Sequence, residues 1–375
     1  MGRWLINIYL LGMKELRSLL ADPILLLLIA YMFSIAIYAV ATGARTEVSN
    51  AAVAYVDLDQ SALTGRIVNA ILPPEFETPQ RIALSDVEAA MDSGEFVFVL
   101  SFPPRFEADV LSGAHPSIQL NVDATAMAQA GNGSVYLQKI IATEIERFVT
   151  GDDTSSHLPI DLVVTAHFNP NLQSIWFTSV MQIINNITIL AVLLTGAALI
   201  REREHGTIEH LLVMPVNASE IMLAKIWANG LMIVVGAILS LWIVVQGVLQ
   251  VPVAGSITLF VLGTILYLIS VTGLGILLAT FTTSMPQFGL LVMPVLVIMN
   301  LLSGSTTPIE SIPVWLQTIM QASPSTHFVA FSQALLYRGA GLETVWPEML
   351  VMALLSAVFF AISLMRFRQT MAMSQ

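Results

Sequence analysis

Long apolar segments alternate with short polar ones along most of this chain, and one long polar stretch interrupts the series near its start. Apolar runs of about 18 residues or more are long enough to cross a bilayer as helices. Six segments fit this description, and we expect each to be a transmembrane span: residues 23–42, 175–200, 223–249, 256–280, 287–303 and 349–365. The pattern predicts a polytopic α-helical membrane protein.

The segment before the first span, residues 1–22, has apolar positions at helical spacing with basic residues between them. This pattern is typical of an amphipathic helix lying along a membrane surface, and we expect one on the cytoplasmic face. A frayed terminus is the alternative, and Gly12 weakens the helical pattern. Asp22 and Pro23 supply an N-cap and a first-turn proline, which mark the start of span one.

The long polar stretch, residues 43–170, alternates strand-like and helix-like patterns. Strand patterns cover residues 52–56, 96–102, 117–122 and 162–168, and helical patterns cover residues 61–72, 103–111 and 134–149. A further helix is predicted to begin at Ser85-Asp86-Val87-Glu88, which has the spacing of a capping box. Strands separated by helices predict an inserted α/β domain outside the membrane.

Residues 304–348 resemble neither a span nor an ordinary loop, because glycine and prolines interrupt two apolar helical pieces. The interruptions are Gly304, Pro308, Pro313 and Pro324. Irregular backbone at membrane depth is tolerated where protein buries it, so we expect a re-entrant hairpin followed by an outer loop. An amphipathic surface loop is the alternative. Residues 366–375 are predicted to be a cytoplasmic tail.

The composition supports the membrane class, with 56% hydrophobic residues, 11% charged residues and a mean hydropathy of +0.78. Basic residues also set the orientation. Those that flank spans lie on the side that holds both termini, which the positive-inside rule makes cytoplasmic: Arg3, Lys14, Arg17, Arg201, Arg203, Lys225, Arg366 and Arg368. Residues 43–170 lie on the other side and carry a net charge of −11, equal to that of the whole chain.

Cysteine is absent, so disulfides and thiolate metal sites are excluded. Ala39-Val40-Ala41 resembles a signal-peptidase site after an apolar run. The residues before that run are too many for an ordinary signal peptide, and an uncleaved anchor is therefore favoured. His205 and His210 are five residues apart and share no helical face, so no metal pair is expected. We expect no catalytic residues and no nucleic-acid partner.

A charged segment, residues 201–222, lies between spans two and three. Span two is predicted to continue as a helix through Arg201–Glu204 and to break at Gly206. Thr207 can cap a second short helix that ends at Pro215 and presents one apolar stripe: Ile208, Leu211 and Leu212. Such a helix is suited to insertion in a groove of a soluble partner. An ordinary charged turn is the alternative.

This segment resembles the coupling helix of ABC-2 type transporter permeases. The matching residues are Glu202, Arg203, Glu204, Gly206, Thr207, Glu209, Leu211, Leu212 and Pro215, with Glu220 and Lys225 following. The resemblance is to the bacterial efflux branch with a large periplasmic domain, whose Val-x-x-Val-Asp-x-Asp-x-Ser start matches Val53–Ser61. Further matches are Ser303-Gly304, Pro308, Pro313, Trp315-Leu316, Pro324, Arg338 and Gly339. His327 departs from the tyrosine that relatives often carry, and Lys225 follows alanine where glycine is common.

The resemblance implies a bacterial inner-membrane, multi-pass permease that pairs with a second permease copy and with ABC ATPase subunits. It also implies a periplasmic membrane-fusion adaptor and contact with membrane lipid. ATP and Mg²⁺ would bind the ATPase rather than this chain. A P-loop needs a lysine directly after a glycine, and none of Lys14, Lys139 and Lys225 follows one.

Polar residues inside the spans are candidates for a substrate path: Gln182, Asn185, Asn186, Asn229, Gln246 and Asn300. Bonding between neighbouring helices is the alternative role. The expected function is export of a lipophilic or amphiphilic substrate by alternating access, because the spans lack the deep ionisable residues of proton-coupled carriers. One alternative is an ATP-driven mechanotransmitter that acts on a periplasmic adaptor without transport. Another is a membrane-anchored binding or signalling protein without an ATPase.

Overall fold

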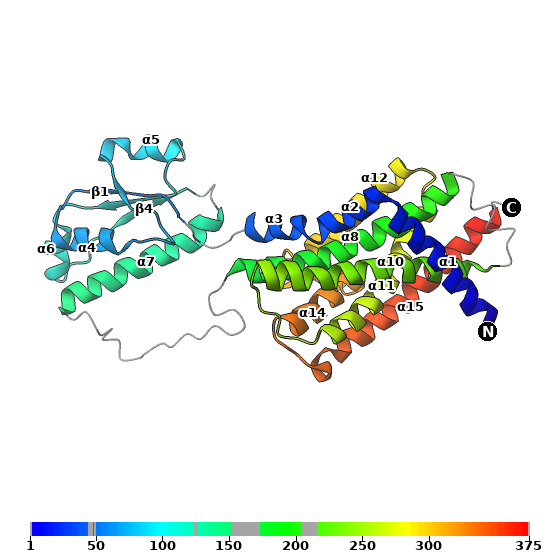
Figure 1. Ribbon diagram of the computed structural model, residues 1–375. Helices are drawn as coiled ribbons and strands as arrows, with labels where there is room; N and C mark the ends of the chain where they lie inside the picture. Colours follow the sequence, from blue (N-terminus) through cyan, green and yellow to red (C-terminus); the bar gives the residue numbers. More distant parts are fainter. Residues whose placement is uncertain are drawn as a thin grey trace. The chain divides into compact units, whose positions relative to one another are not determined.

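The computed structural model describes residues 2–43, 48, 50–123, 127–151, 173–204 and 216–373, with only the backbone given at 127–129 and 371–373. The chain forms two compact units (Figure 1). The first comprises residues 1–43 and 175–375, and the second comprises residues 44–174. The second unit corresponds to the predicted α/β domain, and the first contains the predicted spans.

Six helical segments in the described part of the chain are long and apolar enough to cross a membrane. The first consists of α2 (Pro23–Met32) and α3 (Ile35–Gly43), and the third of α10 (Ala218–Ser240) with the π-helical segment η2 (Leu241–Val248). The other four are α8 (Ser174–Glu204), α11 (Ile257–Thr280), α12 (Met285–Leu302) and α15 (Leu342–Met373). The fold class predicted from the sequence is confirmed.

The helix α8 is the central helix of this unit. Inside the unit, 83% of its most apolar window is buried, against 17% for α15 and 22% for α12. The helices α12 and α15 therefore keep most of their apolar surface for lipid or for another protein. Both chain termini lie at the same end of this unit (Figure 1), as an even number of spans requires.

The N-terminal helix and the broken segment complete the first unit. The helix α1 (Gly2–Ala21) is regular, and the Asp22 side chain accepts hydrogen bonds from the first amides of α2, as the sequence predicts. Between α12 and α15 lie the 3₁₀ turn η3 (Ile309–Ser311), α13 (Val314–Met320) and α14 (Pro324–Leu336). Most of α14 is buried, and it packs against α11 and α15.

The second unit contains a four-stranded sheet in the order β2-β1-β3-β4. The strand β1 pairs in parallel with β2 and β3, and β3 pairs antiparallel with β4. Their bounds are Val53–Asp57 for β1, Gln80–Arg81 for β2, Phe98–Phe102 for β3 and Gln119–Val122 for β4. The helices are α4 (Ala62–Ala70), the 3₁₀ turn η1 (Leu84–Asp86), α5 (Val87–Asp92), α6 (Phe106–Leu111) and α7 (Met127–Thr150).

Two apolar cores hold this sheet between helical layers. The larger core joins alternate strand residues such as Val53 and Phe98 to Leu63 of α4 and Leu137 of α7. The smaller core packs α5 on the opposite face, where Ala54 and Val99 point. Figure 1 shows α5 alone on its face and α4 and α7 on the other. The unit is therefore a layered α/β domain.

The acidic motif after β1 has a structural role. Asp57 accepts hydrogen bonds from the amides of Asp59 and Gln60, and the Asp59 carboxylate accepts one from the amide of Glu107 at 3.0 Å. Glu107 in turn accepts from the amide of Leu63 at 2.9 Å. Burial raises the pKa of Asp59, but hydrogen bonds from the Glu107 amide and the Ser61 side chain outweigh it and hold the pKa below its usual value. The motif therefore stabilises the turn after β1 and caps the first turns of α4 and α6.

Some predicted boundaries differ from the structure. The expected capping box at Ser85 is wrong, because its hydroxyl donates to Asp86 and α5 starts without a side-chain cap. The helix α15 begins at Leu342 rather than 349 and runs through residues 366–373, which were assigned to a tail. Hydropathy detects only the apolar middle of a span and misses its polar turns. The strand predicted at 162–168 lies outside the described residues.

Candidate functional site

The last turn of α8 carries four consecutive charged residues, Arg201–Glu204. Successive residues on an α-helix point about 100° apart, so four in a row face almost every direction around the axis. Each of these side chains contacts a different neighbouring element. We call this group the charged quartet.

Arg201 connects α8 to the first span. Its guanidinium lies 3.3 Å from a carboxylate oxygen of Asp22. The other carboxylate oxygen of Asp22 accepts hydrogen bonds from the amides of Ile24 and Leu25. The same aspartate therefore caps α2 and binds the end of α8.

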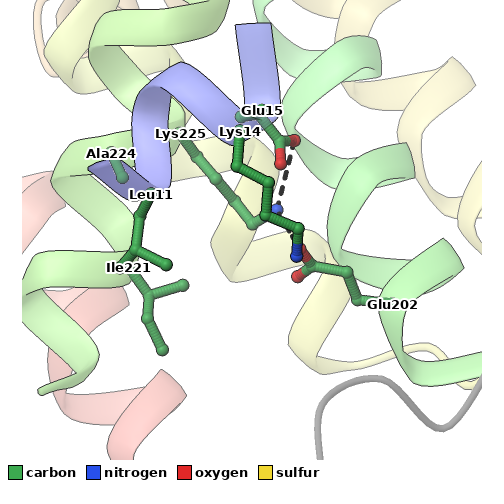
Figure 2. Close-up of a pocket in the computed structure, with 7 residues that line it drawn as sticks. All are labelled: Leu11, Lys14, Glu15, Glu202, Ile221, Ala224 and Lys225. Carbon is green, nitrogen blue, oxygen red and sulfur yellow. Dashed lines mark hydrogen bonds and ion pairs between the residues drawn. The ribbon is translucent and has the colours of Figure 1, made fainter. Parts of the chain in front are cut away.

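Glu202 connects α8 to α10 and α1 through one buried lysine. The Lys225 ammonium lies 2.9 Å from Glu202 and 3.2 Å from Glu15, and its side chain is only 4% exposed. Figure 2 shows Lys225 between these two carboxylates, with Lys14 beside them. They line a cavity of about 20 Å³, which is large enough for one water molecule. Pairing on both sides stabilises an ammonium that would otherwise be costly to bury.

Arg203 and Glu204 bind the loop between the fourth and fifth spans. Arg203 donates to the carbonyl oxygen of Thr282 at 2.6 Å and to that of Ala279 at 3.4 Å, at the C-terminal end of α11. Glu204 accepts from the amide of Met285 at 3.0 Å, at the start of α12. A cation at a helix C-terminus and an anion at an N-terminus each complement the helix dipole.

The helix α1 packs along α10 beside this group. Asn7 donates to the buried carboxylate of Glu220 at 3.2 Å, and the Trp227 indole N–H donates to the carbonyl of Ile8 at 3.1 Å. The Trp227 ring also stacks on Tyr9. A Cβ atom at Gly12 would lie 2.1 Å from that ring. The absence of a side chain at Gly12 therefore leaves room on α1 for the Trp227 ring of α10.

The predicted coupling residues divide into two groups. Glu202, Arg203 and Glu204 lie in the quartet and bind other parts of this chain. The others lie outside the described residues: Gly206, Thr207, Glu209, Leu211, Leu212 and Pro215. Asn217 precedes α10, and its amide donates to Glu220 at 2.6 Å as part of a capping box.

The predicted path residues do not form one hydrogen-bonded group. Gln182 donates to Asn186 at 2.9 Å, and Asn186 donates to the carbonyl of Met32, so this pair joins α8 to the first span. Asn229 is fully buried, and neither polar atom of its side chain has a partner among the described residues. Gln246 is exposed, and Asn185 and Asn300 are half-buried.

The predicted hairpin residues are placed at turns and helix starts. Gly304 has a φ of +92°, a backbone conformation that favours glycine. Its carbonyl accepts a hydrogen bond from Gln333 at 3.3 Å. The three prolines precede or begin short helices: Pro308 for η3, Pro313 for α13 and Pro324 for α14. His327 lies 2.7 Å from Glu348, so α14 is also joined to α15.

Sequence reasoning missed the intramolecular partners of the quartet. Glu15 was read only as part of an amphipathic helix and Asp22 only as a cap. Lys225 enters the sequence analysis only as a basic residue beside a span and as part of the family resemblance, without a partner. Their separation along the chain, 210 residues from Glu15 to Lys225, leaves no local pattern that would join them. No group of three metal-ligating side chains occurs within the described residues.

Comparisons with known proteins agree with this architecture. Residues 19–365 match the family described as ABC-2 family transporter protein. Inner membrane transport permease YhhJ of Escherichia coli (strain K12) is 50% identical over 368 residues, which cover 98% of each chain. Probable multidrug ABC transporter permease YbhR of the same strain is 27% identical over 363 residues, 95% of this chain and 96% of that one.

A more distant match comes from a eukaryote. ABC transporter G family member 20 of Dictyostelium discoideum is 23% identical over 234 residues, which cover 61% of this chain and 32% of that protein. Family membership rests on the match to residues 19–365 and on the 50% identity along the whole chain. The chain therefore belongs to the ABC-2 family of transporters, as a multi-pass inner-membrane permease subunit of a type that works in a dimeric arrangement with an ABC ATPase.

Proposed function

We propose that this permease exports a lipophilic or amphiphilic substrate by alternating access, driven by ATP and Mg²⁺ in a separate ATPase subunit. Residues 205–215 would dock in the ATPase, as the resemblance of this segment implies. The observation that carries the proposal is the charged quartet, which directly precedes that segment. A displacement of the segment would act on α2, α10, α11 and α12 together through four defined contacts.

The lipophilic nature of the substrate is supported by the composition of the spans. Within the described spans, charged residues gather at the ends, and the middle of α8 and α11 offers only amides and hydroxyls. Such a bundle provides no paired charges for a strongly ionic solute. YbhR is named a probable multidrug permease, which is consistent with an apolar substrate class.

Charge reversal at the end of α8 tests the coupling. Glu204→Arg places a cation at the start of α12 and is expected to reduce transport and substrate-stimulated ATP hydrolysis at least tenfold in a reconstituted complex, with insertion intact. Gly206→Pro is expected to have the same effect. Arg368→Glu changes an exposed charge near the C-terminus and serves as the control. Unchanged coupling in Glu204→Arg would contradict the proposal.

The second unit is proposed to contact a periplasmic adaptor. It is compact and acidic and has an open cleft of about 920 Å³ between α5 and β4, lined by residues such as Met91 and Leu120. A photo-crosslinker at Gln119 is expected to capture an adaptor in whole cells.

Transport by vesicles containing only permease and ATPase separates this exporter from a mechanotransmitter, which would use ATP there without moving a substrate.

A further inference from the structure

An apolar groove lies between the first and third spans. Its volume is about 400 Å³, and its two walls are α2 with the two residues after it, Phe33 and Ser34, and α10 with the start of η2. Leu26 and Phe33 contribute one wall, and Val235 and Leu239 the other. Small-molecule sites in proteins fall in this size range and commonly lie between helices of bundles.

Both walls are irregular where they face the groove. The first span breaks between α2 and α3 at Phe33 and Ser34. The third span changes from α-helix to π-helix directly after Ser240. Short π-helical segments inside helices are frequent at functional sites. The two irregular points lie in the lining of one cavity.

Ser240 carries a polar group without a partner. In the spans, hydroxyls such as those of Thr188, Thr195 and Thr264 donate to the carbonyl oxygen four residues earlier. Ser34, which also lines the groove, donates to Ala30 in the same way. Ser240 is 2% exposed, and among the described residues its hydroxyl has no hydrogen-bond partner. An unpartnered hydroxyl in hydrocarbon is costly. Ser240 lines the groove, so an acceptor bound there would supply the missing partner.

The depth of Ser240 indicates which ligand would use it. Val248, at the end of η2, is the eighth residue after Ser240, a distance of at most about 12 Å at the α-helical rise of 1.5 Å per residue. The hydrocarbon core is about 30 Å thick, so the hydroxyl lies far below the headgroup level where lipid esters are found. A ligand that bonds to this hydroxyl must therefore be mostly apolar and carry its hydrogen-bond acceptor among apolar groups.

We propose that this groove binds a lipophilic small molecule with a single carbonyl or similar acceptor, to which Ser240 donates. That the bound molecule is the transported substrate rests on the proposed function. That the groove binds such a molecule does not depend on it. Benzophenone is a suitable probe, because it is apolar, carries one carbonyl and forms covalent adducts when irradiated. The purified permease in lipid nanodiscs should give saturable adducts on the groove residues of α2 and α10.

Two pairs of variants test the site. Ser240→Ala is expected to weaken saturation by benzophenone about fivefold, while Ser34→Ala leaves it unchanged because that hydroxyl is already bonded within its helix. Ala30→Trp should fill the groove and abolish the adducts. Leu27→Trp, at a 72% exposed position of α2 outside the lining, should not. Thermal unfolding of each variant checks that the bundle is intact.

Three results would overturn the site: adducts spread over exposed residues such as Leu290, labelling unaffected by Ala30→Trp, or saturation unaffected by Ser240→Ala.

A second copy covering the groove is tested with single cysteines, since the chain has none of its own. If a second copy covers the groove, Val235→Cys would form a disulfide between copies, whereas Leu231→Cys, which is equally exposed but outside the groove, would not. Groove labelling without benzophenone-stimulated ATP hydrolysis in the full complex would leave the site standing and count against the exporter function.

Discussion

Lys225 shows how one side chain can join three helices. It binds Glu202 of α8 and Glu15 of α1 while lying on α10, and it is almost completely buried. The two carboxylates are 17% and 14% exposed, so the cluster is largely shielded from water. Removing one partner from such a cluster leaves charges that water cannot solvate.

Replacement of Lys225 is therefore expected to be severe. Lys225→Met should lower the free energy of unfolding by about 3–5 kcal/mol, because both glutamates lose the buried ammonium that pairs with them. The triple variant Glu15→Gln, Glu202→Gln, Lys225→Met should recover most of this loss. Thermal unfolding in detergent measures both effects. A triple variant no more stable than Lys225→Met would show that the lysine acts through packing instead.

Asp59 gives a pH-dependent prediction for the second unit. Its pKa is lowered in the folded protein, so its contribution is complete above the ordinary value of 3.8 and is lost as the pH falls through the lowered folded value. Asp59→Ala removes a helix cap and should destabilise the unit by about 1 kcal/mol at pH 7. The difference from the unsubstituted protein should shrink as the pH falls below 3.8 and through the lowered folded value. Thermal unfolding of the full chain, followed by circular dichroism at a series of falling pH values, measures this.

At the scale of elements, close helix contacts depend on glycine. A Cβ atom at Gly275 of α11 would lie 2.8 Å from the carbonyl oxygen of Val192 in α8. Backbone at this distance cannot move aside without separating the two helices. Gly275→Leu should therefore destabilise the bundle by about 1–3 kcal/mol. Gly289→Leu, where no atom lies within 4 Å of the new Cβ, is the matched control in thermal unfolding measurements.

The packing of α1 on α10 gives a second prediction at this scale. Gly12→Leu should separate the helices, because the Trp227 ring occupies the space beside the glycine. A cysteine pair at Asn7 and Glu220, joined by a short bifunctional maleimide, reports the separation, since the tips of these two side chains are in hydrogen-bond contact. Crosslinking should fall several-fold with Gly12→Leu. Gly43→Leu, with nothing near its Cβ, should leave the crosslink unchanged.

The elements themselves were largely predictable, and their polar contacts were not. The spans followed from apolar runs, and the cap at Asp22 followed from its local pattern. The start of α15 was missed because Leu342–Glu348 is too polar to register as a span. Partners such as Asp22 and Arg201 are 179 residues apart, and periodicity carries no information about such pairs.

At the scale of the whole molecule, the two units have separate cores. The large apolar core contains residues of the membrane unit, and the two smaller cores contain residues of the α/β unit. Replacing residues 48–170 by a short Gly/Ser linker should therefore leave the membrane unit inserted and its unfolding temperature within a few degrees. Lys225→Met should then lower the unfolding temperature of the shortened protein as much as it lowers that of the full chain. A much smaller effect in the shortened protein would contradict separate folding.

The distance along the chain between the partners of the charged cluster also bears on biosynthesis. Lys225 is made 210 residues after Glu15, which takes about 10–40 s at ordinary translation rates. For most of that interval Glu15 and Asp22 have been synthesised, but their cationic partners Lys225 and Arg201 have not. Long-range contacts of this kind form late. The cluster can therefore be complete only after the third span has been synthesised.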